Sequence, residues 1–254
     1  MQREMTSVPV TIAIEGLTKD YGDVRAVDNL TLNVSEAEVF GLLGPNGSGK
    51  TTTINCLTGL LKPTQGTIRV GGFDVQAEGQ KAREIVGVSP QETAVYSYLT
   101  GRENVQLFGE LYSVPRATLG PRVDYVMEKM GLMDEAGRRV GKYSGGMKRR
   151  VSIAMALVTD PRIILLDEPT VGMDPQSRRA VWDFILELRD KGKTVVLTTH
   201  YMEEAEELCD NVGIIDHGKL IALGSPADLR AKYGAKNLED VFIQLTGRRI
   251  REGA

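Results

Sequence analysis

Apolar runs and helical patterns alternate along most of the chain. Residues 39–43, 163–166 and 194–198 are rich in Val, Ile, Leu and Phe, which is typical of parallel strands buried on both faces. Residues 180–188 and 202–209 instead carry apolar side chains at three- and four-residue spacing, which predicts amphipathic helices. Strands that alternate with helices in this way predict an α/β fold, with a mostly parallel central sheet and helices on its faces.

The N-terminal part of the chain shows a different pattern. Apolar and polar residues alternate over residues 30–34, and residues 12–17 and 67–70 are also strand-like. Such alternation predicts an N-terminal antiparallel β subdomain whose strands have one buried face. Near the other end, residues 212–223 predict a hairpin around a His-Gly turn. We therefore assign His217 to turn chemistry and give it no catalytic role.

A helical pattern begins at residue 100. Thr100 and Glu103 fit a capping box, a signature of a helix N-terminus. A further apolar helix follows the glycine pair at positions 145 and 146, so we expect an inserted α-helical subdomain that extends to about Leu157. The apolar positions of its first helix, which we assign to the core, are Val105, Phe108, Leu111 and Tyr112.

These patterns divide one domain, residues 1–254, into parts. Residues 1–99 and 158–224 are expected to form the sheet-containing core together with the β subdomain. Residues 100–157 are expected to form the helical subdomain, and residues 225–254 a C-terminal helical tail. A chain of 254 residues is long enough to bury a substantial core in this arrangement.

The overall charge and the cysteines exclude several classes of protein. The formal net charge of −3 argues against a general nucleic-acid binder, which would carry a basic patch or stripe. The short run Lys148-Arg149-Arg150 leaves a local basic patch open. Cys56 and Cys209 have no metal-binding spacing and are too few for a disulfide framework, so we interpret both as buried thiols.

The chain shows no sign of a membrane segment or of an export signal. No apolar run approaches the ~18 residues that a membrane span needs, and the first residues lack a hydrophobic signal core. We therefore expect a soluble protein in the cytoplasm. If it serves a membrane process, its membrane part must belong to another chain.

A glycine-rich loop between an apolar strand and a helix carries the strongest chemical signal. It fits the Walker A pattern of glycine, four residues, glycine, lysine and Ser/Thr. Glycines let successive backbone N–H groups turn inward around an anion, and the following helix presents its positive end to the same phosphates. Lys50 would add a charge at the β- and γ-phosphates, and the Thr51 hydroxyl would ligate Mg²⁺. The predicted nucleotide-binding set is Gly44, Pro45, Asn46, Gly47, Ser48, Gly49, Lys50, Thr51 and Thr52.

A second part of the site follows the strand at residues 163–166. Asp167 and Glu168 stand directly after it, where a metal-bound triphosphate needs a carboxylate. Asp167 would hold Mg²⁺ as a Walker B aspartate does, and Glu168 would act as general base toward the attacking water. An apolar strand that ends in Asp-Glu is commonplace by itself. Together with the loop at Lys50 it predicts a P-loop ATPase that uses ATP and Mg²⁺.

A third motif gives the chain its family resemblance. Ser144, Gly145 and Gly146 stand in the sequence YSGGM, just before an apolar helix. This motif resembles the signature of ABC ATPases, usually written LSGGQ, and the resemblance runs nearly end to end. A serine and open backbone at a helix N-terminus make a second anion site. Tyr143 and Met147 depart from the common form, at positions away from the phosphate-facing Ser144 and Gly146.

The resemblance implies a mode of action. ABC domains pair head to tail, so that each ATP lies between the Walker A loop of one subunit and the signature of the other. The expected partners are a second ATP-binding subunit, either identical or a sister chain, and integral membrane permease subunits, with no nucleic acid. The protein would then lie on the cytoplasmic face of the cell membrane, and the permease would bind the cargo.

The resemblance also assigns roles to four further residues. Tyr21 falls where an aromatic ring stacks on adenine, and Gln91 resembles the Q-loop glutamine, which would sense Mg²⁺ or the water. His200 resembles the switch histidine that contacts the γ-phosphate, and Asp174 matches the D-loop at the dimer seam. The expected catalytic residues are therefore Glu168, His200 and Gln91, and the expected metal ligands Thr51, Gln91 and Asp167.

The form of the signature and of the tail points to one branch of the family. YSGGM followed by basic residues, and the segment Leu238 to Gly247, resemble the exporters of drugs, lipids and polysaccharides. We therefore expect an ATP-hydrolysing motor subunit of an exporter. Two alternatives stay open, a soluble ABC ATPase of a non-transport assembly system and a nucleotide-binding regulator with little turnover. Repair-type coiled-coil insertions and a second ATPase domain, typical of translation factors, are not visible.

Overall fold

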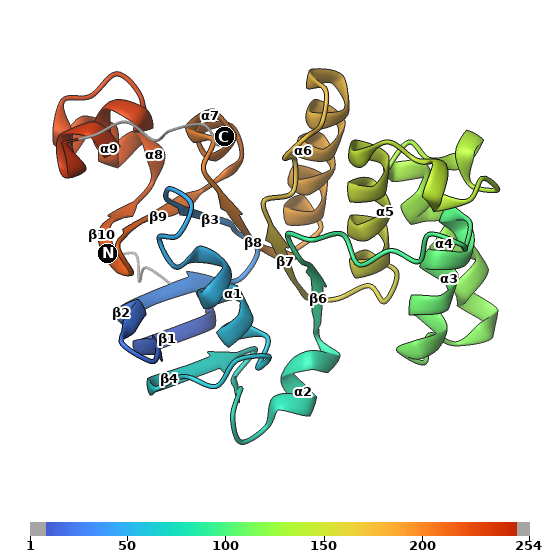
Figure 1. Ribbon diagram of the computed structural model, residues 1–254, viewed down its shortest axis with the longest axis horizontal. Helices are drawn as coiled ribbons and strands as arrows, with labels where there is room; N and C mark the ends of the chain where they lie inside the picture. The colour runs from blue at the N-terminus through green and yellow to red at the C-terminus, as the bar shows by residue number, and fades with distance from the viewer. Residues whose placement is uncertain (1–8, 248–254) are drawn as a thin grey trace, which may run out of the picture.

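The computed structural model describes residues 9–247, which form two β-sheets and the helices around them (Figure 1). The larger sheet is parallel except for the antiparallel pairing of β10 with β9. This observation confirms the predicted mostly parallel central sheet. The strand order is β10 (Lys219–Gly224), β9 (Asn211–Asp216), β3 (Val39–Leu43), β8 (Thr194–Thr199), β7 (Ile163–Asp167) and β6 (Val86–Ser89).

The smaller sheet is antiparallel and lies at the N-terminal side of the fold, which confirms the predicted β subdomain. The pairing alternates buried and exposed side chains along its second strand, as the sequence pattern requires. Its strand order is β2 (Val24–Ser35), β1 (Val10–Tyr21), β4 (Gln65–Val70) and β5 (Phe73–Asp74).

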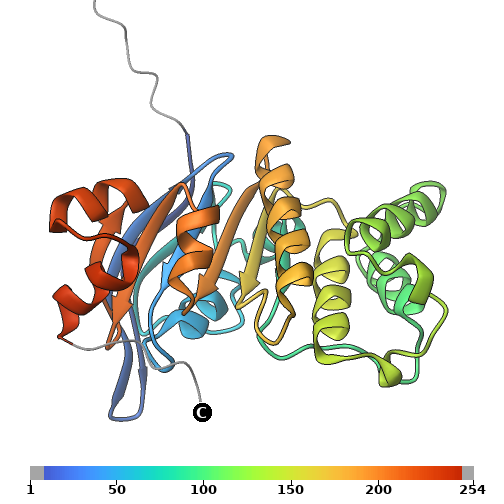
Figure 2. The ribbon, with the colours of Figure 1, turned by 90° about the horizontal axis from the view of Figure 1, so that it is seen from above.

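Helices cover both faces of the larger sheet and extend beyond its β6 edge (Figures 1 and 2). They include the predicted helices on both sides of the signature motif, so the α/β fold with helical additions is confirmed. The bounds are α1 (Lys50–Leu57), α2 (Gly79–Glu84), α3 (Gly101–Leu111), α4 (Arg116–Lys129), α5 (Gly145–Leu157), α6 (Pro175–Asp190), α7 (Met202–Leu208), α8 (Pro226–Tyr233) and α9 (Leu238–Thr246), with 3₁₀ turns at Met133–Glu135 and Val140–Lys142.

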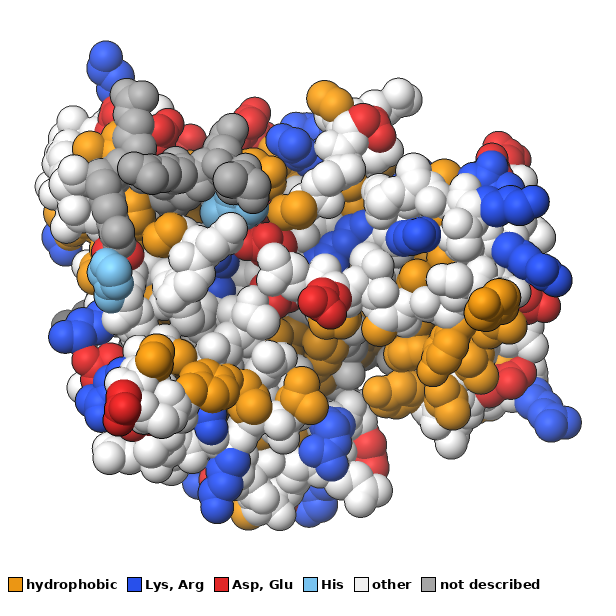
Figure 3. All heavy atoms as spheres, viewed as in Figure 1, with side chains coloured by type: hydrophobic (Ala, Val, Ile, Leu, Met, Phe, Trp, Pro, Cys, Tyr) orange, Lys and Arg blue, Asp and Glu red, His pale blue; other side chains and the backbone are white. Residues whose placement is uncertain are grey.

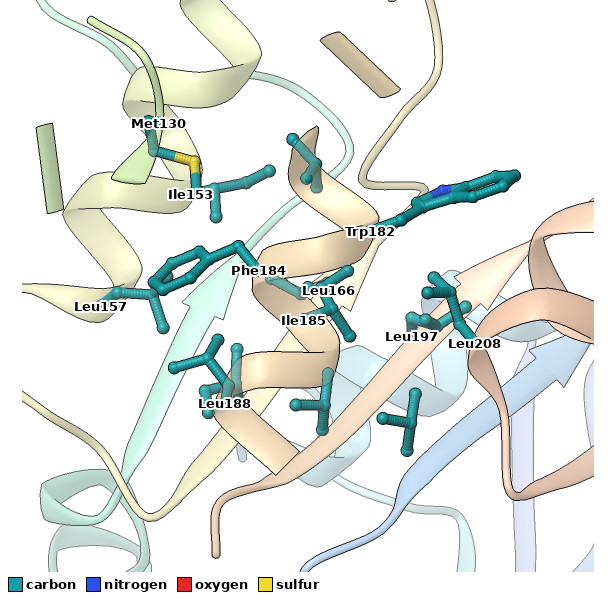
Figure 4. Close-up of a cluster of buried hydrophobic side chains, with 14 of the residues drawn as sticks. Met130, Ile153, Leu157, Leu166, Trp182, Phe184, Ile185, Leu188, Leu197 and Leu208 are labelled. Atoms are coloured by element: carbon teal, nitrogen blue, oxygen red, sulfur yellow. The ribbon is translucent and has the colours of Figure 1, made fainter. Parts of the chain in front are cut away.

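The parallel strands separate two hydrophobic cores. On β3, Val39 and Leu43 belong to the core under the helices, whereas Phe40 and Leu42 belong to the core shared with α1 and the antiparallel sheet. This division follows from the two-residue period of a strand. In the first core, Ile185 of α6 lies beside Leu166 of the sheet, and Phe184 of α6 lies toward Leu157 of α5 (Figure 4).

The start of α3 has the capping box that the sequence predicts. The Thr100 hydroxyl accepts a hydrogen bond from Glu103 N at 3.1 Å, and Glu103 Oε2 accepts one from Thr100 N at 2.8 Å. At the other end of this helix our core assignment is partly wrong, because Leu111 and Tyr112 are 63% and 59% exposed. Both lie where the chain leaves α3 and turns toward α4, so their side chains reach solvent.

None of the helices within residues 9–247 combines the length and the apolar character that a bilayer crossing requires. For residues 225–254 the sequence predicts a C-terminal helical tail, and the structure describes α8 and α9 in the part up to residue 247. Its last part, residues 248–254, lies outside the described residues, as do residues 1–8.

Candidate functional site

The glycine-rich loop connects β3 to α1, between a fully buried strand and a helix. Gly49 is the N-cap of α1 and has φ +108°, a conformation that favours glycine. A Cβ at Gly49 would lie 2.5 Å from Ala26 O, and one at Gly44 would lie 2.3 Å from Ile215 O. The loop therefore packs so closely on neighbouring backbone at Gly44 and Gly49 that these two glycines are sterically required.

The polar groups of the loop suit an anionic ligand. Lys50 is 5% exposed, and its Nζ donates hydrogen bonds to the carbonyl oxygens of Gly44 at 2.8 Å and Pro45 at 3.1 Å. The buried Ser48 Oγ has no hydrogen-bond partner in the described part of the chain. A buried polar atom without a partner is costly, and a phosphate oxygen at this loop would satisfy it. The residues present therefore fit a nucleotide phosphate.

Three other residues that the sequence predicts for the site lie around the carboxylate of Glu168. Its Oε1 lies 3.1 Å from His200 Nδ1 and 3.6 Å from Lys50 Nζ. Its Oε2 accepts a hydrogen bond from Gln91 Nε2 at 3.2 Å. Four side chains from the loop before α3, from α1, and from the ends of β7 and β8 therefore meet at one point.

These contacts set the charge of the cluster. Burial by itself would raise the pKa of Glu168, but His200 and the Lys50 ammonium outweigh burial and lower this pKa below its ordinary value. Burial lowers the pKa of Lys50, and the Glu168 and Asp167 carboxylates act against that shift. Glu168 is therefore an ionised carboxylate at neutral pH, as a general base must be.

Asp167 stands beside this cluster and is 1% exposed. The Thr198 hydroxyl donates to Asp167 Oδ1 and accepts a hydrogen bond from Glu168 N at 3.0 Å. Among the described residues, no group of three or more His, Cys, Asp and Glu side chains could hold a metal ion alone. Mg²⁺ is commonly held by one or two carboxylates together with substrate phosphates. Asp167 would supply such a carboxylate, and the Thr51 hydroxyl would be a further oxygen ligand.

Ser144 caps α5, where its Oγ accepts a hydrogen bond from Met147 N at 3.2 Å. Gly145 and Gly146 form the first residues of the helix, and a Cβ at Gly145 would meet nothing within 4 Å. In both views α5 stands apart from α1, with β7 and α6 between them (Figures 1 and 2). The structure thus leaves the signature away from the phosphate loop of its own chain.

The remaining predicted residues lie at the borders of the site. Tyr21 ends β1, is 47% exposed, and has Lys19 Nζ 5.2 Å from its ring centroid. Its sheet borders the phosphate loop through the close approach of Ala26 to Gly49. Asp174 caps α6 by accepting a hydrogen bond from Ser177 N at 2.9 Å.

Two further residues contribute to the site, although the sequence does not predict them. Thr198 is one of them, and it is recognised only from the parallel pairing of β7 with β8, which sets it opposite Asp167. Arg149 is the other, because it is 4% exposed and bonds to the backbone beside Asp167, Glu168 and Gln91. The local basic patch that the run Lys148-Arg149-Arg150 left open is not formed by all three residues, since Arg149 is buried.

Comparisons with known proteins agree with this geometry. A family model described as ABC transporter matches residues 27–171. The linearmycin resistance ATP-binding protein LnrL of Bacillus subtilis is 42% identical over 238 residues, which are 94% of this chain and 75% of that protein. The Nod factor export ATP-binding protein I of Ralstonia nicotianae is 43% identical over 223 residues, which are 88% of this chain and 69% of that protein.

Solved structures agree as well. An ATP-binding subunit of an ABC transporter superposes with a TM-score of 0.85 at 28% identity, covering 93% of this chain and 99% of that one. A dimeric ATP-binding cassette in a post-hydrolysis state, bound to ADP and Pi, has a TM-score of 0.78 at 28% identity, covering 84% and 98%. The chain therefore belongs to the ABC transporter family, as one of its ATP-binding subunits, and it hydrolyses ATP.

Proposed function

We propose that this chain is the motor subunit of an exporter, which pairs head to tail with a second ATP-binding subunit around two ATP–Mg²⁺. It would lie on the cytoplasmic side of the membrane and move residues 100–157 as a helical subdomain against the core. The observation that carries the proposal is the meeting of Lys50, Gln91 and His200 at the Glu168 carboxylate, at 3.6, 3.2 and 3.1 Å. The names of the relatives, which speak of drug resistance and of export, support the direction of transport.

The residues suggest how hydrolysis would proceed. Glu168 would take a proton from the attacking water as a P–O bond forms at the γ-phosphorus and the bond to the bridging oxygen breaks, leaving ADP and phosphate. When ATP binds, the Lys50 ammonium would donate to phosphate oxygens in place of the loop carbonyls of Gly44 and Pro45. Thr51, Asp167 and Gln91 would hold Mg²⁺, which supplies charge neutralisation at the phosphates.

The position of the signature supports the composite site. Ser144 caps α5, and the helix begins with two glycines, which have no side chain to cover its first N–H groups. A head-to-tail pair related by a twofold axis would bring each signature to the other subunit's phosphates. Tyr21 would then stack on the adenine at the edge of the same site.

An apolar groove of about 450 Å³ supports a membrane partner. It lies between α1, β6, α3 and α5, and exposed Leu60 and Tyr112 stand at its sides. Hydrophobic side chains gather around a hollow on this face (Figure 3). Pro90 and Ala94, which flank the Gln91 loop, also line the groove. An apolar segment of a permease seated here would contact the loop that reaches Glu168.

Co-purification from membranes tests the proposal. Wild-type protein should recover a multi-helix membrane protein, and Tyr112→Glu should reduce that recovery about tenfold while ATP hydrolysis by the isolated chain is unchanged. Leu223→Glu, at an exposed site on β10, is the control and should recover the partner normally. Recovery of a soluble scaffold protein in place of a membrane protein would contradict the exporter and favour a soluble assembly ATPase.

A further inference from the structure

Arg149 lies in the first turns of α5, between two neighbours that are partly exposed, and is itself 4% exposed. All five N–H groups of a guanidinium can donate, and the structure gives this one five acceptors. They are the main-chain carbonyl oxygens of Pro90 and Gln91 for Nη1, Asp167 and Glu168 for Nη2, and Pro169 for Nε, of which Gln91, Glu168 and Pro169 lie at 2.9, 2.8 and 3.3 Å.

These acceptors belong to two separate segments of the active site. Pro90 and Gln91 follow β6, whereas Asp167 ends β7 and Glu168 and Pro169 follow it. The side chains of Gln91 and Glu168 meet at 3.2 Å, while Arg149 holds the main chains of both residues. One guanidinium therefore fixes the spacing of the two segments at the point where their side chains touch.

The backbone of Glu168 needs such support. Its φ of +51° is left-handed, which is uncommon for a residue other than glycine and persists where surrounding contacts enforce it. The Glu168 N–H donates to Thr198 O at 3.1 Å and to Thr198 Oγ1 at 3.0 Å. On the other side, Arg149 Nη2 donates to the Glu168 carbonyl at 2.8 Å. Thr198 and Arg149 therefore hold the peptide groups on the two sides of this residue.

A buried cation of this kind is costly unless its partners compensate for lost hydration. Burial lowers the pKa of Arg149, but the nearby Asp167 and Glu168 carboxylates act against that shift. A guanidinium stays protonated in proteins, so the charge is retained. Lysine would keep this charge but offers a single nitrogen, which cannot span two loops as a planar fork does.

Arg149 also connects the active site to the signature. It stands on the same helix as Ser144, which caps α5 five positions earlier. We propose that Arg149 is a positioning residue that sets Glu168 and Gln91 in their catalytic arrangement from the signature helix. The inference rests on the proposed role of Glu168 as general base. A shift of α5, such as contact of Ser144 with the partner's ATP would impose, then reaches Glu168 through the guanidinium.

The variants Arg149→Lys and Arg150→Lys form a matched pair. Arg150 is adjacent and also bonds to backbone carbonyls, but its Nη1 contacts Met130 O at 2.7 Å, near the end of α4. For Arg149→Lys we expect kcat to fall at least tenfold while the Kd for ATP, measured by titration calorimetry, stays within twofold. Arg150→Lys should leave both values within twofold. If Arg149→Lys does not fold, as judged by its thermal transition, Arg149→Gln replaces it.

A double-mutant cycle separates positioning from general structural support. If Arg149 acts through Glu168, adding Arg149→Lys to Glu168→Gln should leave single-turnover hydrolysis of radiolabelled ATP within twofold of Glu168→Gln alone. Unchanged kcat in Arg149→Lys, or fully additive losses, would overturn the inference. Turnover that is unaffected by Glu168→Gln would instead overturn the proposed role of Glu168, whichever result Arg149 gives.

Discussion

At the scale of single residues, the site depends on buried charges that satisfy one another. Lys50 and Glu168 are both about 5% exposed on their side chains and lie 3.6 Å apart. Removing one partner of such a pair leaves the other charge buried without compensation. The same pair is also where the phosphates and the attacking water would arrive, so binding and catalysis can be separated by changing one partner at a time.

Lys50→Ala should weaken ATP binding by about 1.5–3 kcal/mol, or roughly 10- to 150-fold in Kd, because a charge-assisted contact to the phosphates is lost. Titration calorimetry with ATP measures the change. Lys129→Ala removes a cation on α4 that pairs with Glu187 at 2.6 Å and serves as the control, with an unchanged Kd. Equal affinities for wild type and Lys50→Ala would mean that the loop does not bind the phosphates.

At the scale of elements, the buried parallel strands could be predicted because they are short apolar runs, and the antiparallel strands and long helices because their apolar positions repeat at a fixed period. The two separate cores on the opposite faces of β3 follow from the two-residue period of a strand. The short α2 (Gly79–Glu84) and β5 (Phe73–Asp74) could not, since two to six residues carry no period. Leu111 and Tyr112 fit the period of α3 but extend beyond the elements that would cover them.

The candidate site was also predictable only where its residues form a local pattern in the sequence. Lys50, Asp167 and Glu168 stand in local motifs, so a single stretch of sequence reveals them. Arg149 and Thr198 act through contacts between segments 18 to 59 residues apart, such as Arg149 with Pro90 and Asp167. Only the folded arrangement of α5, β7 and β8 brings these groups together.

Glu204 of α7 shows how one buried group joins several elements. It is 1% exposed, and its Oε1 accepts hydrogen bonds from Thr170 Oγ1 at 2.7 Å and from Trp182 Nε1 at 2.9 Å. Thr170 follows β7, and Trp182 belongs to α6. Burial raises the pKa of Glu204, and the hydrogen bonds from Thr199, Thr170 and Trp182 only partly oppose that shift.

This raised pKa gives a pH-dependent stability. The folded protein holds a proton that the unfolded chain releases near the ordinary value of 4.5, so the stabilisation is complete below that pH and is lost as pH rises through the folded pKa. Glu204→Gln should therefore gain stability relative to wild type as pH rises from about 5 to 8. Urea unfolding at several pH values measures this difference, and exposed Glu203→Gln is the control. A difference that does not change with pH would contradict the assignment.

At the scale of the whole molecule, the phosphate loop and the signature lie on different parts of one chain (Figures 1 and 2). The proposed composite site would need two copies, or a copy and a sister chain, and the isolated chain should then be a poor ATPase at low concentration. Binding of ATP would close the pair, and hydrolysis at Glu168 would open it. This cycle of closing and opening would depend on the placement of the two motifs on different parts of the chain, more than on any single residue.

The most direct test is the mass of Glu168→Gln with ATP and Mg²⁺, measured by gel filtration with light scattering. Because this variant binds ATP but should hydrolyse it very slowly, we expect it to elute at twice the monomer mass with ATP, and as a monomer with ADP. Adding Ser144→Arg, which blocks the signature while leaving the phosphate loop intact, should return it to a monomer. A Glu168→Gln protein that binds ATP and yet stays monomeric would contradict a composite site formed by two copies of this chain.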